Sequence, residues 1–205
     1  MDMASPAGSL HSGSMNDPVT ARERTALLVI DVQQAFDDPQ WGQRNNHDAE
    51  SNVGMLLSDW RLAGRPVFHV RHQSASEGQL FSLGGPGYEV KPEAREIAGE
   101  PIVVKTVNSA FIGTDLEVQL RRAGISSLVI CGLTTDHCVS TTTRMAANLG
   151  FHVTIVSDAT ATFERLGPDG RRWSATELHD AALASLHEEF AVIQTTNEVV
   201  RAAGS

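Results

Sequence analysis

Three residues that can carry acid–base or nucleophilic chemistry follow short apolar runs in the sequence. Asp31 ends the run LLVI, Lys105 ends IVV, and Cys138 follows LVICG at the start of the segment CVSTTTRMAANLG. A carboxylate or an ammonium that ends a buried strand is strongly destabilising unless it is paired. Asp31 and Lys105 are therefore expected to be partners, either in a structural ion pair or in an active site.

Cys138 favours the active site over the structural pair. At the start of a helix, the helix dipole and a nearby lysine ammonium would lower the pKa of the thiol and favour the thiolate. Backbone N–H groups in that turn have no intrahelical acceptor and can stabilise an oxyanion. Cys138 is thus predicted to be a nucleophile, whereas Cys131 lies inside its strand and is expected to pack as a small apolar residue.

The residues beside Cys138 in GLTTDHC offer an alternative triad on consecutive positions. Consecutive residues in a turn point in different directions, so His137 is poorly placed to take the proton of Cys138. We expect Thr135 and Asp136 to cap the following helix through their side-chain oxygens. Asp136 and His137 are accordingly predicted to be structural.

The histidines do not have the spacing of a metal site. His69 and His72 lie three positions apart on a strand, where an odd separation sends side chains to opposite faces. The other histidines considered form no ligand pattern: His47, His152, His179 and His187, of which His152 and His187 are expected on the surface. The sequence therefore predicts neither a metal nor a cofactor.

The elements that must position these residues alternate along the chain. Six short β-branched segments, separated by helical patterns, are predicted strands: 26–32, 66–70, 101–105, 127–132, 152–158 and 191–195. Such alternation is typical of βαβ units, and the lack of polar alternation predicts burial on both faces. Thr114–Glu117 and Ser174–Glu177 match the capping box of a helix start.

These elements predict the fold class α/β, as a three-layer α/β/α sandwich around a parallel sheet. Ligands bind such sheets at the carboxyl ends of the strands, where Asp31, Lys105 and Cys138 are all expected. The long connections 33–48, 73–100 and 159–173 are expected to shape the site.

Composition limits the classes of partner. The chain has 205 residues, 41% of them hydrophobic, and 16 basic against 25 acidic residues give a formal charge of −9. The basic residues form no stripe of the kind that binds nucleic acid. No apolar run approaches the roughly 18 residues of a membrane span. We expect a single cytoplasmic domain over 25–205, preceded by a disordered tail over 1–24 with a candidate vector-derived leader before Met15.

Two stretches of the chain resemble the isochorismatase-like cysteine hydrolases, a group that holds nicotinamidases, N-carbamoylsarcosine amidases and streptothricin hydrolases. They are LLVIDVQQAF and the segment from KTVNSAF through GLTTDHCV to SDATATF, and the similarity extends over residues 25 to 198. The resemblance implies a six-stranded sheet of order 3-2-1-4-5-6, a homo-oligomer, and a catalytic triad of Asp31, Lys105 and Cys138. It also implies a cis peptide bond between Leu133 and Thr134 and an oxyanion hole made by the backbone amides of Thr134 and Cys138.

The implied strand order creates one geometric difficulty for Lys105. Its strand would lie two places from that of Asp31, about 10 Å away at ordinary strand spacing. Lys105 must therefore reach Asp31 by the length of its side chain or from a displaced strand end.

The resemblance, together with an intact Cys138, implies a cysteine-dependent amidohydrolase. It would cleave a C–N amide, ureido or lactam bond of a small molecule through a thioester, in the manner of the streptothricin hydrolases. HVRHQSASEG lacks the WHP-type metal cluster of nicotinamidases, which disfavours nicotinamide. Two alternatives remain: an isochorismatase-type vinyl-ether hydrolase in which Asp31 protonates the substrate without covalent catalysis, and a non-enzymatic binding module.

Six residues of the flanking loops are expected to line the substrate pocket, although each could equally belong to ordinary packing. They are Phe36, Trp41, His72, Phe81, Asn108 and Phe111.

Overall fold

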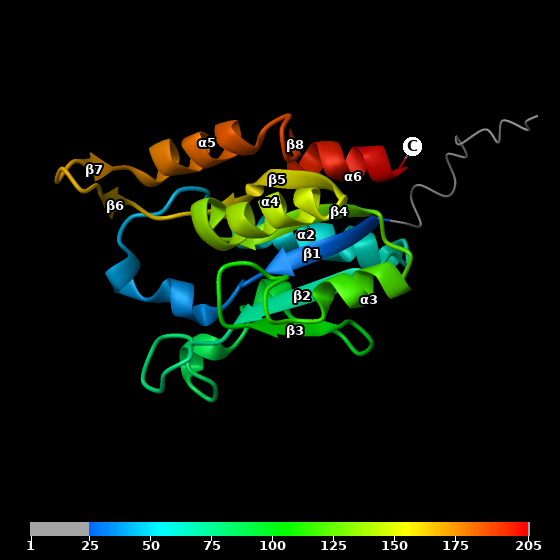
Figure 1. The fold of residues 1–205 in the computed structure, drawn as a ribbon, viewed down its shortest axis with the longest axis horizontal. Coiled ribbons are helices and arrows are strands. Elements are labelled where there is room, and N and C mark those ends of the chain that lie inside the picture. The colour runs from blue at the N-terminus through cyan, green and yellow to red at the C-terminus, as the bar shows by residue number, and fades with distance from the viewer. Residues whose placement is uncertain (1–24, 205) are drawn as a thin grey trace, which may run out of the picture.

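The computed structural model describes residues 25–204, which form a six-stranded, all-parallel sheet (Figure 1). The predicted order 3-2-1-4-5-6 is confirmed, with β8 as the sixth strand of the sheet. In spatial order the strands are β3 (Ile102–Lys105), β2 (Val67–His72), β1 (Thr25–Ile30), β4 (Ser127–Leu133), β5 (His152–Ala161) and β8 (Val192–Gln194).

Helices cover both faces of the sheet, which confirms the three-layer sandwich. They are α2 (Ala49–Leu62), α3 (Leu116–Arg122), α4 (Ser140–Asn148), α5 (Ala175–Leu186) and α6 (Thr196–Gly204). Successive side chains of β1 alternate between two hydrophobic clusters, as the pleat of a strand requires. Leu28 and Ile30 pack with residues of α3, α4 and α5, whereas Leu27 and Val29 pack with residues of α2 and α6.

Two of the long connections, 33–48 and 159–173, lie at the carboxyl end of the sheet, and 73–100 starts there before it runs back to the start of β3. In Figure 1 the carboxyl end is on the left, the side to which the arrows of β1 and β2 point. Two 3-10 helices, Gln34–Asp37 and Pro39–Trp41, occupy the first connection, and the third holds the short antiparallel pair β6 (Arg165–Leu166) and β7 (Arg172–Trp173). This hairpin was not predicted from the sequence, because two-residue strands leave no periodic signal.

One of the two predicted capping boxes is confirmed. At the start of α5 the Ser174 N–H donates to Glu177 Oε2 at 2.8 Å and the Glu177 N–H donates to Ser174 Oγ at 3.2 Å. The prediction at Thr114 is wrong, since α3 begins at Leu116 and the Thr114 hydroxyl donates to the Ala110 carbonyl at 2.6 Å instead. Threonine hydroxyls compete for such local backbone acceptors.

Two expectations concern the ends of the molecule and its relation to membranes. The predicted tail 1–24 lies outside the described residues. None of the helices in residues 25–204 is long and apolar enough to cross a bilayer.

A buried carboxylate joins β2 to the segment that precedes β3. Glu100 accepts from Arg61 Nε at 2.8 Å and from the Ile97 N–H at 3.0 Å, and it lies 2.8 Å from Nε2 of the buried His69. Burial alone would raise the pKa of Glu100, but the hydrogen bonds from Arg61, Ile97 and His69 outweigh it and lower that pKa to about 2. Glu100 is therefore ionised across the physiological range.

Replacing Glu100 with alanine is expected to lower the free energy of unfolding by about 1–3 kcal/mol, because the buried His69 and the partly buried Arg61 lose their acceptor. The wild-type stabilisation is fully present above the ordinary glutamate pKa of about 4.3. It is lost as the pH falls towards the folded-state pKa of about 2. Urea unfolding at pH 7 and pH 3 measures both effects. The exposed Glu93→Ala control should change stability by no more than about 0.5 kcal/mol, and an equal loss in both variants would contradict the account.

Candidate active site

Asp31, Lys105 and Cys138 meet at the carboxyl end of the sheet. Lys105 Nζ lies 2.6 Å from Asp31 Oδ2 and donates to Cys138 Sγ at 3.3 Å. The side chains of Asp31 and Lys105 are completely buried, and Cys138 is 8% exposed. Residues far apart in the sequence thus form one contiguous group of carboxylate, ammonium and thiol.

Lys105 reaches Asp31 across the end of the intervening strand. Asp31 directly follows β1, Lys105 is the last residue of β3, and His72 ends β2 between them in register with Lys105. The side chain of Lys105 passes the His72 ring, whose Nδ1 lies 3.3 Å from Lys105 Nζ. The length of the lysine side chain therefore accounts for the pairing of residues from strands two places apart.

The backbone next to the site adopts several uncommon conformations. Asp31 has a φ of 50°, Gly132 has a φ of 117°, and the peptide bond between Leu133 and Thr134 is cis. A Cβ atom at Gly132 would lie 2.0 Å from the Ile30 carbonyl oxygen of the neighbouring strand. Gly132 therefore lets β4 approach β1 closely just before the turn that carries Cys138.

Substituting Gly132 with alanine is expected to destabilise the fold by more than about 4 kcal/mol, since both φ and the close approach exclude a side chain. Gly124 is the matched control, because its φ is 69° but a Cβ atom there would have nothing within 4 Å. Gly124→Ala should cost only about 1–2 kcal/mol. Chemical denaturation of the two variants tests this difference, and equal losses would show that the contact with Ile30 is unimportant.

The turn that carries Cys138 differs from the predicted helix start. Residues Thr135–Val139 form a single π-helical turn, and α4 begins only at Ser140. The predicted capping roles of Thr135 and Asp136 are wrong. Thr135 Oγ1 lies 2.9 Å from Nδ1 of the buried His179 in α5, and Asp136 accepts from the Thr162 hydroxyl at 2.5 Å. Both side chains tie the turn to neighbouring segments, so they remain structural by a different route.

The protonation of the thiol also differs from the expectation. Burial is the main cause that raises the pKa of Cys138 to about 12, and the Asp31 carboxylate adds to the effect while Lys105 opposes it. The predicted lowering of this pKa is therefore wrong. Burial likewise raises the pKa of Asp31, against the opposing influence of Lys105. The Asp31 carboxyl lies within hydrogen-bonding reach of this neutral thiol.

A cavity of about 130 Å³ opens onto this group. Its lining contains five of the six predicted pocket residues together with Asp31, Cys138 and two further residues of the turn. The full lining is Asp31, Phe36, Trp41, His72, Phe81, Asn108, Thr134, His137 and Cys138. Phe36 packs against Trp41 and Phe81 with ring centroids 5.2 and 5.1 Å apart, which gives the cavity an aromatic wall. Cys138 Sγ lies 3.8 Å from Asn108 Oδ1, another residue of the lining.

The sixth predicted pocket residue, Phe111, is not in the lining. It lies in the core beneath α3 and α4, where its ring stacks on Phe151 with centroids 6.0 Å apart. His137, which was expected to be purely structural, does line the cavity. The π-helical turn explains this result, because it changes the direction of His137 relative to an ordinary helix start, and no sequence pattern signalled it.

One buried oxygen atom at the site, Thr134 Oγ1, lacks a hydrogen-bond partner within the described part of the chain. Buried polar atoms without partners are uncommon in folded proteins. Because Thr134 lines the cavity, its hydroxyl is available to a bound molecule.

The histidines of β2 point away from each other, as their spacing predicts. His69 contacts Glu100, whereas His72 contacts Lys105. Within residues 25–204 there is no group of three His, Cys, Asp or Glu side chains that could hold a metal ion. His152 and His187 are exposed, as expected.

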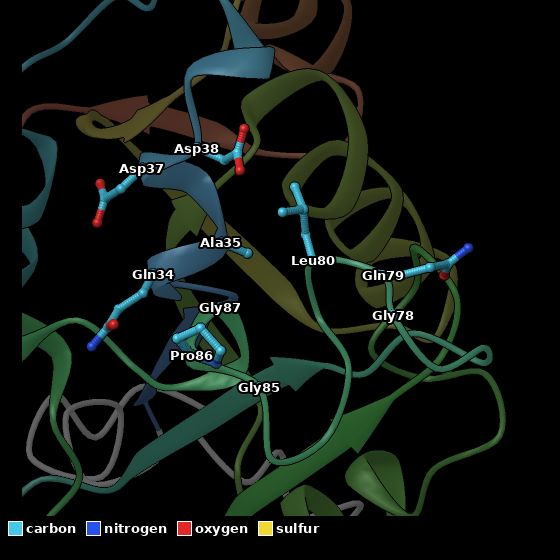
Figure 2. A pocket seen from close by; sticks show the side chains of 10 residues that line it. All are labelled: Gln34, Ala35, Asp37, Asp38, Gly78, Gln79, Leu80, Gly85, Pro86 and Gly87. Atoms are coloured by element: carbon cyan, nitrogen blue, oxygen red, sulfur yellow. The ribbon is translucent and has the colours of Figure 1, made fainter.

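Three larger hollows lie outside the cavity, and one of them, of about 610 Å³, is at the opposite end of the sheet beside Thr25 and His152. The other two lie near the cavity. One of about 550 Å³ shares Trp41 and Phe81 with the cavity, so these rings separate an inner from an outer space. The other, of about 390 Å³, lies between Gln34 and Asp37 on one side and Gln79 and Leu80 on the other (Figure 2). The Asp37 carboxylate there is paired with Lys91 at 2.6 Å, and this hollow is not lined by Asp31, Lys105 or Cys138.

The fold and the site together define the class of protein. A 3-2-1-4-5-8 parallel sheet carries a buried carboxylate, ammonium and thiol at its carboxyl end, and residues 25–198 match the family described as the Isochorismatase domain. The chain therefore belongs to the isochorismatase family of hydrolases.

Individual relatives agree with this assignment. The uncharacterised isochorismatase family protein YrdC of Bacillus subtilis is 46% identical, over 87% of this chain and 95% of its own length. A streptothricin hydrolase of Streptomyces noursei is 32% identical over 87% of this chain and 63% of its own length. The crystal structure of an isochorismatase-family hydrolase from Chromobacterium violaceum has a TM-score of 0.87 and 40% identity, covering 98% of this chain and 99% of that one.

Proposed function

We propose that this hydrolase is a cysteine-dependent amidohydrolase that cleaves a C–N bond of a small amide, ureido compound or lactam. The observation that carries the proposal is the position of Lys105 Nζ, 2.6 Å from Asp31 Oδ2 and 3.3 Å from Cys138 Sγ, beside a cavity that Asp31 and Cys138 line. A thiol, a base and a cation in mutual contact are what nucleophilic attack on a carbonyl group requires.

In the proposed acylation step, Cys138 Sγ attacks the carbonyl carbon while its proton moves to the Asp31 carboxylate. The carbonyl π electrons move to oxygen, and the backbone amides of Thr134 and Cys138 donate to the resulting oxyanion. Collapse of this intermediate breaks the C–N bond, and the leaving amine takes the proton from Asp31. Lys105 holds Asp31 in position and stabilises sulfur as it loses the proton.

In the proposed deacylation step, Asp31 removes a proton from water as the water oxygen attacks the thioester carbonyl. The C–S bond then breaks, the carboxylic acid leaves, and the proton returns to sulfur. Asp31 therefore acts as base and acid in turn, which suits a carboxyl group whose pKa is raised by burial.

The charges around the cavity favour an uncharged amide over the vinyl-ether alternative. Isochorismate, the vinyl ether of the family name, carries carboxylate groups that need cationic partners. No lysine or arginine is among the described residues that line the cavity, and the three N–H bonds of the adjacent Lys105 face Asp31, Cys138 and His72. A vinyl-ether hydrolase would also have no use for the thiol.

The size of the cavity limits the part of the substrate that it can enclose. A cavity of about 150 Å³ can hold one benzene ring, and this one measures about 130 Å³. A substrate with a larger leaving group, as in a streptothricin-type amide, would extend past Trp41 and Phe81 into the outer hollow.

A panel of small amides, ureido compounds, lactams and vinyl ethers tests the proposed function. We expect release of amine or ammonia from members of the first three classes and no hydrolysis of the vinyl ethers. Hydrolysis confined to vinyl ethers would replace the proposal with the non-covalent alternative, and hydrolysis of none would favour a binding module.

A further inference from the structure

One buried side chain, that of Gln33, forms hydrogen bonds with both the N–H and the carbonyl group of His72. Gln33, which is completely buried, accepts from the His72 N–H at 2.7 Å and donates to the His72 carbonyl at 3.0 Å. The imidazole ring rests edge-on against Phe81, with centroids 5.2 Å apart. The ring is therefore fixed where β2 ends, at the wall of the cavity.

The contact with Lys105 determines which ring nitrogen carries the proton. An ammonium group can only donate, so His72 Nδ1, 3.3 Å from Lys105 Nζ, must be the unprotonated acceptor. Burial, and then the charge of Lys105, lower the pKa of His72, so the ring is neutral at pH 7. The single ring proton consequently lies on Nε2.

The Nε2–H of His72 has no acceptor among residues 25–204. The same cavity contains the unpartnered hydroxyl oxygen of Thr134. The proposed oxyanion donors are backbone amides on the Thr134–Cys138 turn, a different element. The His72 donor is thus free to contact a second group of the substrate.

We propose that His72 is a substrate-binding residue whose Nε2–H donates to an uncharged acceptor of the substrate, a carbonyl oxygen other than that of the scissile bond. The inference rests on the proposed function, since it places the scissile carbonyl at Cys138. The favoured substrates are then compounds with a second carbonyl group close to the first, such as imides, acylureas and diamides. Simple monoamides lack the second acceptor and bind less well.

Two substitutions of His72 test the roles of the two ring nitrogens separately. In His72→Asn the side-chain oxygen can still accept from Lys105, but the outward donor is lost. In His72→Gln the amide N–H₂ can replace the outward Nε2–H. Neither change affects the backbone hydrogen bonds to Gln33, so both variants are expected to fold.

Alkylation of Cys138 tests the role without a known substrate. Iodoacetamide presents a carbonyl oxygen next to the reacting carbon, whereas allyl bromide presents no acceptor; in both cases a C–S bond forms, halide leaves and the thiol proton passes to Asp31. Loss of one hydrogen bond should slow iodoacetamide about 10-fold in His72→Asn and less than about 3-fold in His72→Gln. Allyl bromide should react at the wild-type rate in both.

Three results would overturn the inference. Unchanged iodoacetamide rates would show that His72 donates nothing, and equal slowing of both probes would show that it acts only through Lys105. Nitrogen NMR of histidine-labelled protein, with His72 identified through the His72→Asn variant, should place the proton on Nε2, and a proton on Nδ1 would refute the tautomer. Failure of wild-type Cys138 to react with either probe contradicts the proposed function instead, and the NMR result then decides the inference alone.

Discussion

Turnover of the best amide substrate is expected to fall by about 10⁴-fold or more when Cys138 is replaced with alanine, because no other group can form the covalent intermediate. The side chain is small and the substitution leaves the Asp31–Lys105 pair in place. Stability should therefore change by only about 1 kcal/mol. Steady-state kinetics and urea unfolding measure the two quantities separately.

Cys131→Ala is the matched control for that experiment. Cys131 is completely buried in β4, and burial raises the pKa of its thiol, so it is expected to take no part in the reaction. Its replacement should preserve turnover. Turnover of Cys138→Ala within about tenfold of wild type would exclude covalent catalysis and favour the vinyl-ether type of mechanism.

The second large effect concerns the buried pair of Asp31 and Lys105. Removing either charge alone leaves the other buried without its partner, so Asp31→Asn and Lys105→Met should each lower the free energy of unfolding by about 3–5 kcal/mol. The double variant has no uncompensated charge. We expect it to be more stable than the sum of the two single losses predicts.

Catalytic activity is not expected to recover in the double variant, even though part of the stability does. Asp31→Asn cannot accept the thiol proton, so both the single and the double variant should lose about 10³-fold or more in kcat. The exposed pair of Arg121 and Glu117 provides a control, since Glu117→Gln should change stability by less than about 0.5 kcal/mol. Recovery of activity in the double variant would show that the pair is structural only.

The fold and the meeting of the three reacting residues could be predicted from the sequence because both follow from strong regularities. Short β-branched runs that alternate with helices predict a parallel sheet. Because all its strands run in the same direction, residues that end strands come together at one edge, as Asp31 and Lys105 do here. The difficulty raised by the strand order is resolved by a flexible side chain that passes His72.

The local details were less predictable because they depend on packing. The π-helical turn at Thr135–Val139 replaces the expected helix start, so Thr135 and Asp136 bond to neighbouring segments instead of capping a helix, and His137 of this turn lines the cavity. The pKa of Cys138 is raised rather than lowered because its burial outweighs the nearby lysine, and the extent of burial cannot be derived from sequence spacing. Phe111 likewise follows the core beneath α3 rather than the pocket.

Intact-protein mass spectrometry of enzyme quenched in acid during amide turnover can detect the thioester on Cys138. We expect an added mass equal to the acyl part of the substrate, located on the peptide that contains Cys138 and missing from Cys138→Ala. Continued amide turnover with no added mass at Cys138, together with unimpaired turnover by Cys138→Ala, would contradict covalent catalysis by Cys138.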